Sequence, residues 1–311
     1  MSVIGHNNAE ELLYGSNLNT ARSFLIEGPR GVGKALLAQN FAGHILGSSD
    51  RVKNRSHSDF LLIEKRTDEE KGSKKEIVAE DAKKLRGFLE LTPAEGKHRV
   101  AIIDSADELN NQAANSILKM VEEPPRNSII ILLSHGGHVL PTIRSRCLTI
   151  KLQSLPHEEM KQVVSQIMVN ITESDLELLT DLSEGSPGMA KMLYENEGLW
   201  LLDNLVEIIN FYPKYDYLNL TKFAEKAMKA EKGWEAFCYI LSWLLTSIAK
   251  GYATGRQVTV RGTQLDPNVN LSLLLDDIER WNKIVDETDI FNLEKKQIVV
   301  NQLSAFAECF Y

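Results

Sequence analysis

A glycine-rich octapeptide, GPRGVGKA at residues 28–35, constrains the fold of this chain more than any other feature. It follows the apolar, strand-forming stretch SFLIEG and leads into the helical pattern KALLAQNFAGHIL. Gly28, Gly33 and Lys34 fit the GxxxxGK pattern, in which backbone N–H groups approach phosphates and the lysine reaches the terminal phosphates. The sequence therefore predicts a strand–loop–helix unit shaped for nucleotide phosphates, with Gly31 inside the loop. A glycine-rich turn that arose by chance is the alternative.

The remainder of the first half alternates short apolar stretches with amphipathic ones. RVAIID and SIIILLS are continuous apolar runs, which is typical of strands buried on both faces of a parallel sheet. Because helical patterns separate the strands, the sequence predicts an α/β domain with a doubly wound parallel sheet. The expected strands lie at 23–28, 59–64, 99–104, 128–134 and 147–152, the expected helices at 34–46, 79–91 and 110–123, and a charged, solvated loop at 64–76.

The second half is helical in pattern. Three short helices are expected between residues 154 and 197, and longer ones follow. Apolar residues recur at spacings of three and four in the longest pattern, where Lys250 and Gly251 are expected to end the helix. A chain of 311 residues exceeds one usual domain. We therefore predict an α/β domain at 1–153, a three-helix lid at 154–197 and an all-α domain at 198–311, whose apolar face comprises Trp234, Phe237, Leu241, Leu244 and Ile248.

Composition excludes several classes of function. The net charge of −8 argues against broad electrostatic binding of nucleic acid. The three cysteines, Cys147, Cys238 and Cys309, form no CxxC pair, so neither a zinc module nor a disulfide framework is supported. The N-terminus lacks a signal-peptide pattern, and the longest apolar stretch is too short to cross a bilayer. A reduced, cytoplasmic protein with no membrane partner is expected.

Two positions needed for ATP turnover hold unsuitable residues. Ala35 stands where a serine or threonine hydroxyl would bind the metal of a metal–ATP complex. Asp104 ends an expected strand and is the candidate magnesium ligand, although it could instead cap a helix. Ser105 follows it, where hydrolysing enzymes usually carry a water-activating glutamate, and Asp107 lies too far along the chain to substitute. We expect no ATP hydrolysis by this chain alone. Weak binding of ATP or ADP stays open, and no cofactor is certain.

An arginine stands at the edge of the expected α/β domain, in the stretch TIRSRC at 142–147. The planar guanidinium of Arg146 suits phosphate oxygens, and a neighbouring protein could use it as an arginine finger. An ordinary surface ion pair is the alternative.

Together these stretches amount to a family resemblance. NNQAANSILKMVEEPPRNS (110–128) and LPTIRSRC (140–147) resemble the signature region of the clamp-loader branch of AAA+ proteins. Within that branch the chain is most similar to the delta-prime subunits of bacterial DNA polymerase III. The resemblance covers residues 20 to 195 with specific motifs, and Ser145, Arg146 and Cys147 match the SRC motif of the family.

The resemblance implies an AAA+ domain, a lid and a collar that oligomerises. It implies gamma/tau and delta subunits as partners and, through the complex, the sliding clamp and primed DNA. The chain would be a stator whose Arg146 serves the ATP site of an adjacent motor subunit. The main alternative is an active motor subunit of gamma/tau type. A small-molecule kinase and an unrelated scaffold are further alternatives.

Three departures from the family pattern accompany the resemblance. The region from Gly47 to Asp59 lacks the four cysteines with which many members hold zinc, so no metal is predicted. The stretch GSPGMAKM at 185–192 lacks the nucleotide-sensing arginine of motor subunits. His57 is interpreted as structural, because the proline of a family turn is absent. Ser134 is the polar candidate at a sensor position, and the two histidines that follow it, His135 and His138, are interpreted as surface-loop residues.

Overall fold

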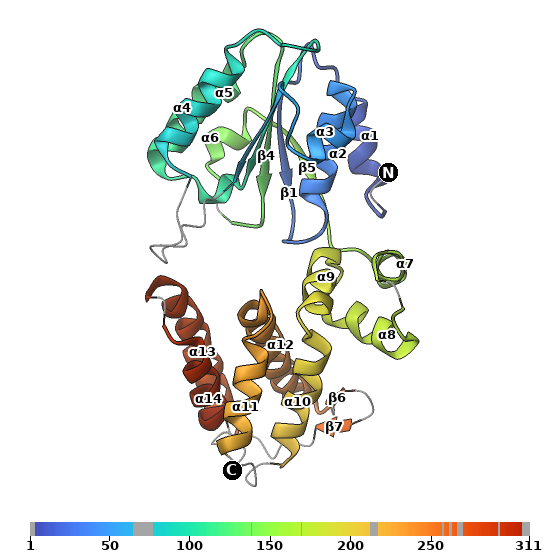
Figure 1. Ribbon diagram of the computed structural model, residues 1–311, viewed down its shortest axis with the longest axis vertical. Coiled ribbons are helices and arrows are strands. Elements are labelled where there is room, and N and C mark those ends of the chain that lie inside the picture. Colours follow the sequence, from blue (N-terminus) through green and yellow to red (C-terminus); the bar gives the residue numbers. More distant parts are fainter. Residues whose placement is uncertain are drawn as a thin grey trace. The chain divides into compact units, whose positions relative to one another are not determined.

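The computed structural model describes residues 4–64, 77–137, 139–168, 170–211, 217–256, 258–260, 263–265, 270–291 and 293–306 (Figure 1). The charged stretch at 65–76 and His138 lie outside the described residues. The chain forms two compact units. The described residues up to Val163, with Gly185–Gly188, make the first unit, and Val164–Glu184 with the described residues from Met189 onward make the second. The predicted division into three domains stays a prediction.

A five-stranded parallel sheet forms the centre of the first unit, as predicted. Its order is β2-β3-β4-β1-β5, and every neighbouring pair is parallel. All seven residues of β4 are buried, because helices cover both faces of the sheet. The strands are β1 (Ser23–Glu27), β2 (Phe60–Glu64), β3 (Arg99–Asp104), β4 (Ser128–Ser134) and β5 (Leu148–Lys151).

Alternate residues of each strand point to opposite faces, and a different set of helices packs on each face. Phe24 and Ile26 of β1 join the apolar core formed with α1 (Asn7–Tyr14), α2 (Lys34–Leu46) and α3 (Ser49–Lys53). Leu25, between them, joins the core on the opposite face. The helices there are α4 (Ala79–Leu89), α5 (Asn111–Glu122) and α6 (Pro141–Arg144), with the 3₁₀ turn η1 (Ala106–Glu108) (Figure 1).

Helices dominate the rest of the chain. They are α7 (His157–Ile167), α8 (Glu173–Leu182), α9 (Pro187–Glu195), α10 (Gly198–Phe211), α11 (Tyr217–Ala227), α12 (Gly233–Thr254), α13 (Leu271–Phe291) and α14 (Lys295–Phe306). The predicted apolar face of α12 is confirmed, because all five of its residues are buried. None of the helices in the described part of the chain is both long and apolar enough to span a bilayer.

Two details of the helical region differ from the sequence prediction. Helix α12 continues past Gly251 to Thr254 and ends at Gly255, which adopts a left-handed conformation with φ of 65°. Gly251 is needed inside the helix because a Cβ there would lie 2.6 Å from Val258 Cγ2. Val258 begins an antiparallel two-stranded hairpin, β6 (Val258–Val260) with β7 (Thr263–Leu265), within a region expected to be all-α.

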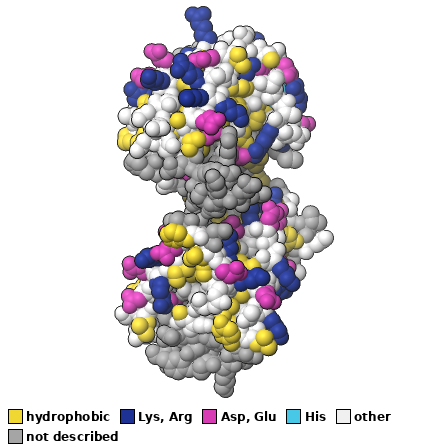
Figure 2. All heavy atoms as spheres, turned by 60° about the vertical axis from the view of Figure 1, so that its left-hand side comes forward, with side chains coloured by type: hydrophobic (Ala, Val, Ile, Leu, Met, Phe, Trp, Pro, Cys, Tyr) yellow, Lys and Arg dark blue, Asp and Glu magenta, His cyan; other side chains and the backbone are white. Residues whose placement is uncertain are grey.

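Acidic and basic side chains are interspersed on the surface drawn in Figure 2, and each unit carries both kinds there. This mixture agrees with the modest net charge of −8.

Candidate functional site

The Gly-rich loop, residues 28–35, connects β1 to α2 at the carboxyl end of the sheet. Gly33 lies at the N-cap of α2 with φ of 107°, a left-handed conformation that glycine adopts without strain. Gly28 has no room for a side chain, because a Cβ would lie 2.3 Å from Leu152 O. Gly31 also has a positive φ, of 82°. The predicted strand–loop–helix geometry is therefore present.

The side chain of Lys34 folds back onto this loop. It is 2% exposed, and its Nζ donates hydrogen bonds to Gly28 O at 2.7 Å and to Pro29 O. Burial lowers the pKa of Lys34 to about 8, although the charges of Asp104 and Asp107 oppose the shift. The ammonium that would reach a phosphate is thus held by carbonyls of its own loop.

Asp104, the candidate metal ligand, lies at the same carboxyl end of the sheet as the Gly-rich loop. Asp104 ends β3, and β4 lies between β3 and β1. His135, the first residue after β4, places its Nε2 2.7 Å from Asp104 Oδ1. His135 lies in the loop after β4 with 29% of its side chain exposed, and its contact with Asp104 is a feature that the surface-loop interpretation did not include. Asp104 caps no helix, because Asn110 is the side-chain cap of α5 and Ser105 precedes η1.

The carboxylate of Asp107 also accepts hydrogen bonds from within the chain. Ser134 Oγ donates a hydrogen bond to Asp107 Oδ1 at 2.7 Å, and the backbone N–H of His135 donates to Asp107 Oδ2. Ser134 is buried, so this pair fixes the end of β4 to η1. Asp107 is held by this contact and does not replace a glutamate at position 105.

The residues at this edge do not suit a magnesium ion. Ala35 packs against the apolar core and offers no oxygen, and Ser105 is 2% exposed. Asp104, the one carboxylate at the expected place, is paired with His135. A hydroxyl and a free carboxylate are the ligands that such a magnesium site requires. The loop keeps the glycines and the lysine of the GxxxxGK pattern, although carbonyls of the loop hold Lys34. The residues at the expected positions of the metal ligands are replaced or paired.

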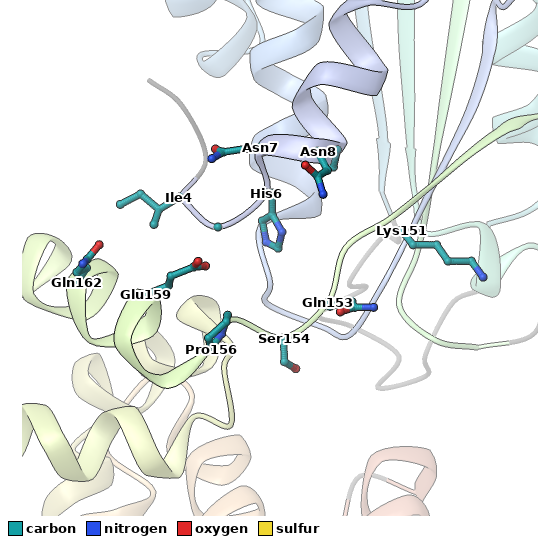
Figure 3. Close-up of a pocket in the computed structure, with 12 residues that line it drawn as sticks. Ile4, His6, Asn7, Asn8, Lys151, Gln153, Ser154, Pro156, Glu159 and Gln162 are labelled. Carbon is teal, nitrogen blue, oxygen red and sulfur yellow. The ribbon is translucent and has the colours of Figure 1, made fainter.

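A polar pocket of about 710 Å³ lies in the same unit, beside the N-terminal segment (Figure 3). His6 lines it and reaches the Gly-rich loop, because its Nε2 lies 2.9 Å from Val32 O. The volume is within the range of small-molecule sites. The other lining residues are Ile4, Gly5, Asn7, Asn8, Ala9, Lys151, Gln153, Ser154, Pro156, Glu159 and Gln162.

Arg146 lies at the amino-terminal end of the parallel strands, whereas Lys34 lies at their carboxyl-terminal end. It precedes β5, whose Leu148 pairs with Phe24 at the start of β1, whereas the Gly-rich loop follows the end of β1. The five residues of β1, at about 3.3 Å each, separate the two ends. Arg146 is therefore far from the loop of its own chain.

Contacts within the chain hold the SRC segment. Arg146 Nη1 donates to Thr142 O at 3.0 Å, and Nη2 lies 3.2 Å from Glu122 Oε1. Ser145 Oγ donates to Thr142 O at 3.2 Å. Burial raises the pKa of Cys147 to about 12, so its thiol is inert at neutral pH.

Arg144 anchors the same segment to β1. Its Nη2 lies 2.7 Å from Oε1 of Glu27, the residue just before the Gly-rich loop. The Glu27 side chain is 12% exposed, so the ion pair neutralises a largely buried carboxylate.

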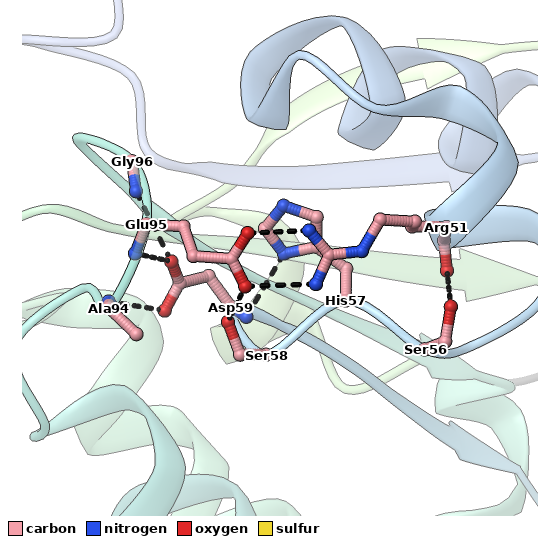
Figure 4. Close-up of polar contacts among 8 residues, drawn as sticks. All are labelled: Arg51, Ser56, His57, Ser58, Asp59, Ala94, Glu95 and Gly96. Atoms are coloured by element: carbon pink, nitrogen blue, oxygen red, sulfur yellow. Dashed lines mark hydrogen bonds and ion pairs between the residues drawn. The ribbon is translucent and has the colours of Figure 1, made fainter.

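A second polar cluster has a structural role (Figure 4). The backbone N–H of Asp59 donates to His57 Nδ1 at 3.1 Å, which supports the structural interpretation of that buried histidine. The Asp59 carboxylate accepts backbone N–H bonds from Ala94, Glu95 and Gly96 and lies 3.4 Å from Arg99. These contacts fix the start of β2 to the loop before β3. The absence of zinc stays a prediction.

Two parts of the chain that contact the Gly-rich loop could not be identified from the sequence. His6 and the segment at 185–188 both contact the Gly-rich loop, from 26 and about 156 residues away. No local pattern marks such contacts. The position of His135, directly after a buried strand, was the one available signal for its contact with Asp104.

Comparisons with known proteins agree with this geometry. Residues 14–156 match the model of a family described as DNA polymerase III, delta subunit. Over 194 residues the chain is 29% identical to DNA polymerase III subunit delta' of Pseudomonas aeruginosa, a match that covers 58% of each protein. Over 224 residues it is 27% identical to the gamma subunit of Buchnera aphidicola, covering 65% of this chain and 60% of that protein. The chain thus spans less than two thirds of the length of these curated relatives.

A solved structure shares the fold along the whole chain. A gamma subunit-related protein from Thermotoga maritima superimposes with a TM-score of 0.55 at 19% identity, covering 98% of this chain and 99% of that one. The Gly-rich loop, the five strands of the sheet and the SRC segment all lie within the residues that match the family model. Residues 14–156, less than half of the chain, match that DNA polymerase III delta-subunit family, and the chain is similar in sequence to delta' and gamma/tau subunits of that polymerase.

Proposed function

We propose that this chain is a non-hydrolysing, delta-prime-type subunit of a bacterial DNA polymerase III clamp loader. It would assemble with gamma/tau and delta subunits and help them to place a sliding clamp on primed DNA. The pairing of Asp104 with His135, together with the missing hydroxyl at Ala35, carries the proposal. A site without its metal ligands lacks the charge that stabilises phosphoryl transfer.

Arg146 would act in trans. Its distance from the chain's own loop and its partial exposure, 34% of the side chain, suit a guanidinium offered to a neighbour. In the ATP site of an adjacent gamma/tau-type subunit it would stabilise the charge that develops on the transferred phosphoryl group. Arg144 and Glu122 would orient the segment that bears it.

The test is steady-state ATP hydrolysis by the purified chain with magnesium, beside a Lys34→Ala variant. No turnover above that of the variant is expected. Turnover that survives purification and disappears in Lys34→Ala would instead make the chain a motor subunit. That second candidate is favoured by one observation, the match to a gamma subunit over 224 residues.

A further inference from the structure

Glu27 is a carboxylate at the end of an interior strand of the sheet. It is the last residue of β1, and its backbone pairs with Ser134 of β4 on one side and with Lys151 of β5 on the other. The Glu27 side chain is largely buried. Glutamates are seldom buried to this extent without a partner of opposite charge. This carboxylate therefore requires a cation from within the fold.

The face of the sheet on which Glu27 lies follows from the alternation of residues along β1. Leu25 packs into the core on the face of α4, α5 and α6, whereas Phe24 and Ile26 pack on the opposite face. Because successive residues of a strand point to opposite faces, Glu27 points to the same face as Leu25. Ile143 of α6 is buried in that same core. The register of β1 thus directs Glu27 toward α6.

Arg144, the residue after Ile143, supplies the cation. Its Nη2 lies 2.7 Å from Glu27 Oε1, and about half of its side chain is exposed. Movement of Arg144 away from this position would leave the charge of Glu27 without its partner, which is costly for a largely buried carboxylate. The contact therefore restrains Arg144 more firmly than an ion pair between two exposed side chains would.

Arg144 and Arg146 belong to one hydrogen-bonded turn. The backbone N–H of Arg146 donates to Ile143 O at 3.1 Å, and that of Cys147 donates to Arg144 O at 3.3 Å. Thr142 O, in the same turn, accepts a hydrogen bond from Arg146 Nη1 at 3.0 Å. A rotation of this turn would move both guanidinium groups. Arg146 is thus carried by a turn that the core holds through Ile143 and that β1 holds through Arg144.

We propose that Glu27 is a positioning residue for Arg146, and that it acts through Arg144 to set the direction in which the Arg146 guanidinium leaves the turn. This inference rests on the proposed function, in which Arg146 serves the ATP site of a neighbouring subunit. Glu27 itself would contact no ATP. A displacement of about 1 Å at a group that stabilises a transition state can lower the rate by about 10²-fold. The residue just before this chain's own Gly-rich loop would therefore support a reaction at the loop of another subunit.

Glu27→Gln in the full chain tests the first step, because it keeps the shape of the side chain and removes its charge. The Nε–H resonance of Arg146 in ¹⁵N NMR spectra should shift, and amide exchange at residues 143–147 should become about tenfold faster. The matched control is Glu64→Gln. Glu64 ends β2, which β3 and β4 separate from β1, and it pairs with Arg55 at 2.7 Å. An unchanged resonance and unchanged exchange in folded Glu27→Gln protein would overturn the proposal.

ATP hydrolysis by the complex with gamma/tau-type and delta subunits tests the second step. Arg146→Ala defines the part of the turnover that depends on the arginine. Glu27→Gln should lower that part about tenfold and leave the KM for ATP within about twofold of wild type, because the lost interaction acts on the transition state. Arg144→Met removes the same ion pair from its exposed side, so it should act alike, and it keeps the test available if Glu27→Gln fails to fold. The double variant should lose no more than either single variant. Losses that multiply in the double variant would show that the two residues act separately.

The measurements also separate this inference from the proposed function. A loss of turnover in Arg146→Ala with none in Glu27→Gln would refute the positioning role and leave the arginine finger in place. No loss in Arg146→Ala would refute the finger. The NMR measurement, which needs no partner subunit, would then decide by itself whether Glu27 positions Arg146.

Discussion

Arg146 and Glu122 of the same chain form an ion pair, with 3.2 Å between Nη2 and Oε1. The surface ion pair that the sequence left as an alternative therefore exists. It does not exclude a role in trans, because both side chains are partly exposed and such pairs contribute only about 0–1 kcal/mol. A phosphate group brought by a neighbour could replace the carboxylate as the partner of Arg146.

Arg146→Ala should slow ATP hydrolysis by the assembled complex and leave this chain stable. Loss of an arginine finger lowers the rate at the site it serves by roughly 10³-fold or more, so the complex should lose the share of its turnover that comes from that site. Loss of an exposed ion pair costs at most about 1 kcal/mol of unfolding free energy. Steady-state hydrolysis with gamma/tau-type and delta subunits and urea unfolding of the chain alone measure the two effects. Arg126→Ala is the control, because Arg126 is exposed between α5 and β4. A complex with Arg146→Ala that hydrolyses ATP at the wild-type rate contradicts the assignment.

Lys34 should make stability depend on pH in the alkaline range. Its folded pKa, about 8, lies below the value of about 10.4 for a free lysine, so the unfolded chain binds more protons between these values. The folded state therefore gains stability as the pH rises through this window. The unfolding free energy of wild type minus that of Lys34→Met should increase by about 2 kcal/mol from pH 7 to pH 9.5. A difference that stays constant in urea unfolding at the two pH values would show that Lys34 titrates normally.

Asp59 should contribute stability that acid removes. Burial raises its pKa, but three backbone N–H donors and Arg99 outweigh burial and leave the pKa below its usual value. This contribution is present above the unfolded pKa of about 3.9 and is lost as the pH falls through the folded pKa. Asp59→Asn should cost about 3 kcal/mol at pH 7 and progressively less below pH 4. Urea unfolding across pH measures this, with exposed Asp50→Asn as the control. An equal cost at pH 7 and pH 3 would refute the electrostatic explanation.

Helix α13 should contribute to assembly through exposed apolar residues. Leu273 and Leu275 are 44% and 52% exposed, which suits an interface with sister subunits better than a surface in water. Leu275→Glu should weaken association at least tenfold and change the unfolding free energy by less than about 0.5 kcal/mol. Sedimentation of mixed subunits measures association. Leu91→Glu, on the first unit and 59% exposed, is the control. Equal weakening by both variants would place the interface elsewhere.

The sheet could be predicted because each of its strands is a continuous apolar run bounded by turn or helix signals. The end of α12 was misplaced for a physical reason. Gly251 resembles a helix terminator in the sequence, but the close approach of Val258 requires glycine there within the helix. The hairpin of β6 and β7 has strands of three residues each, which are too short for a period-two signal.

The candidate site was predictable where chemistry depends on local spacing. Gly28, Lys34 and Asp104 have the predicted places because the loop and the strand ends are local features. The partners of these groups were not predictable. His135 and the segment at 185–188 reach the site through the order of the strands and the path of the chain, which no window of neighbouring residues records.

The parallel pairing of β1 with β5 gives the first unit a direction. One end of the sheet carries a loop suited to receive a phosphate, and the other carries a guanidinium suited to be given to one. On the proposed function, copies or relatives of such a unit would associate head to tail, by a contact that is not self-complementary. A subunit that offers its arginine at one end but has no reactive site at the other would be the last member of such a row. In a row of this kind, the number of reactive junctions is one fewer than the number of subunits.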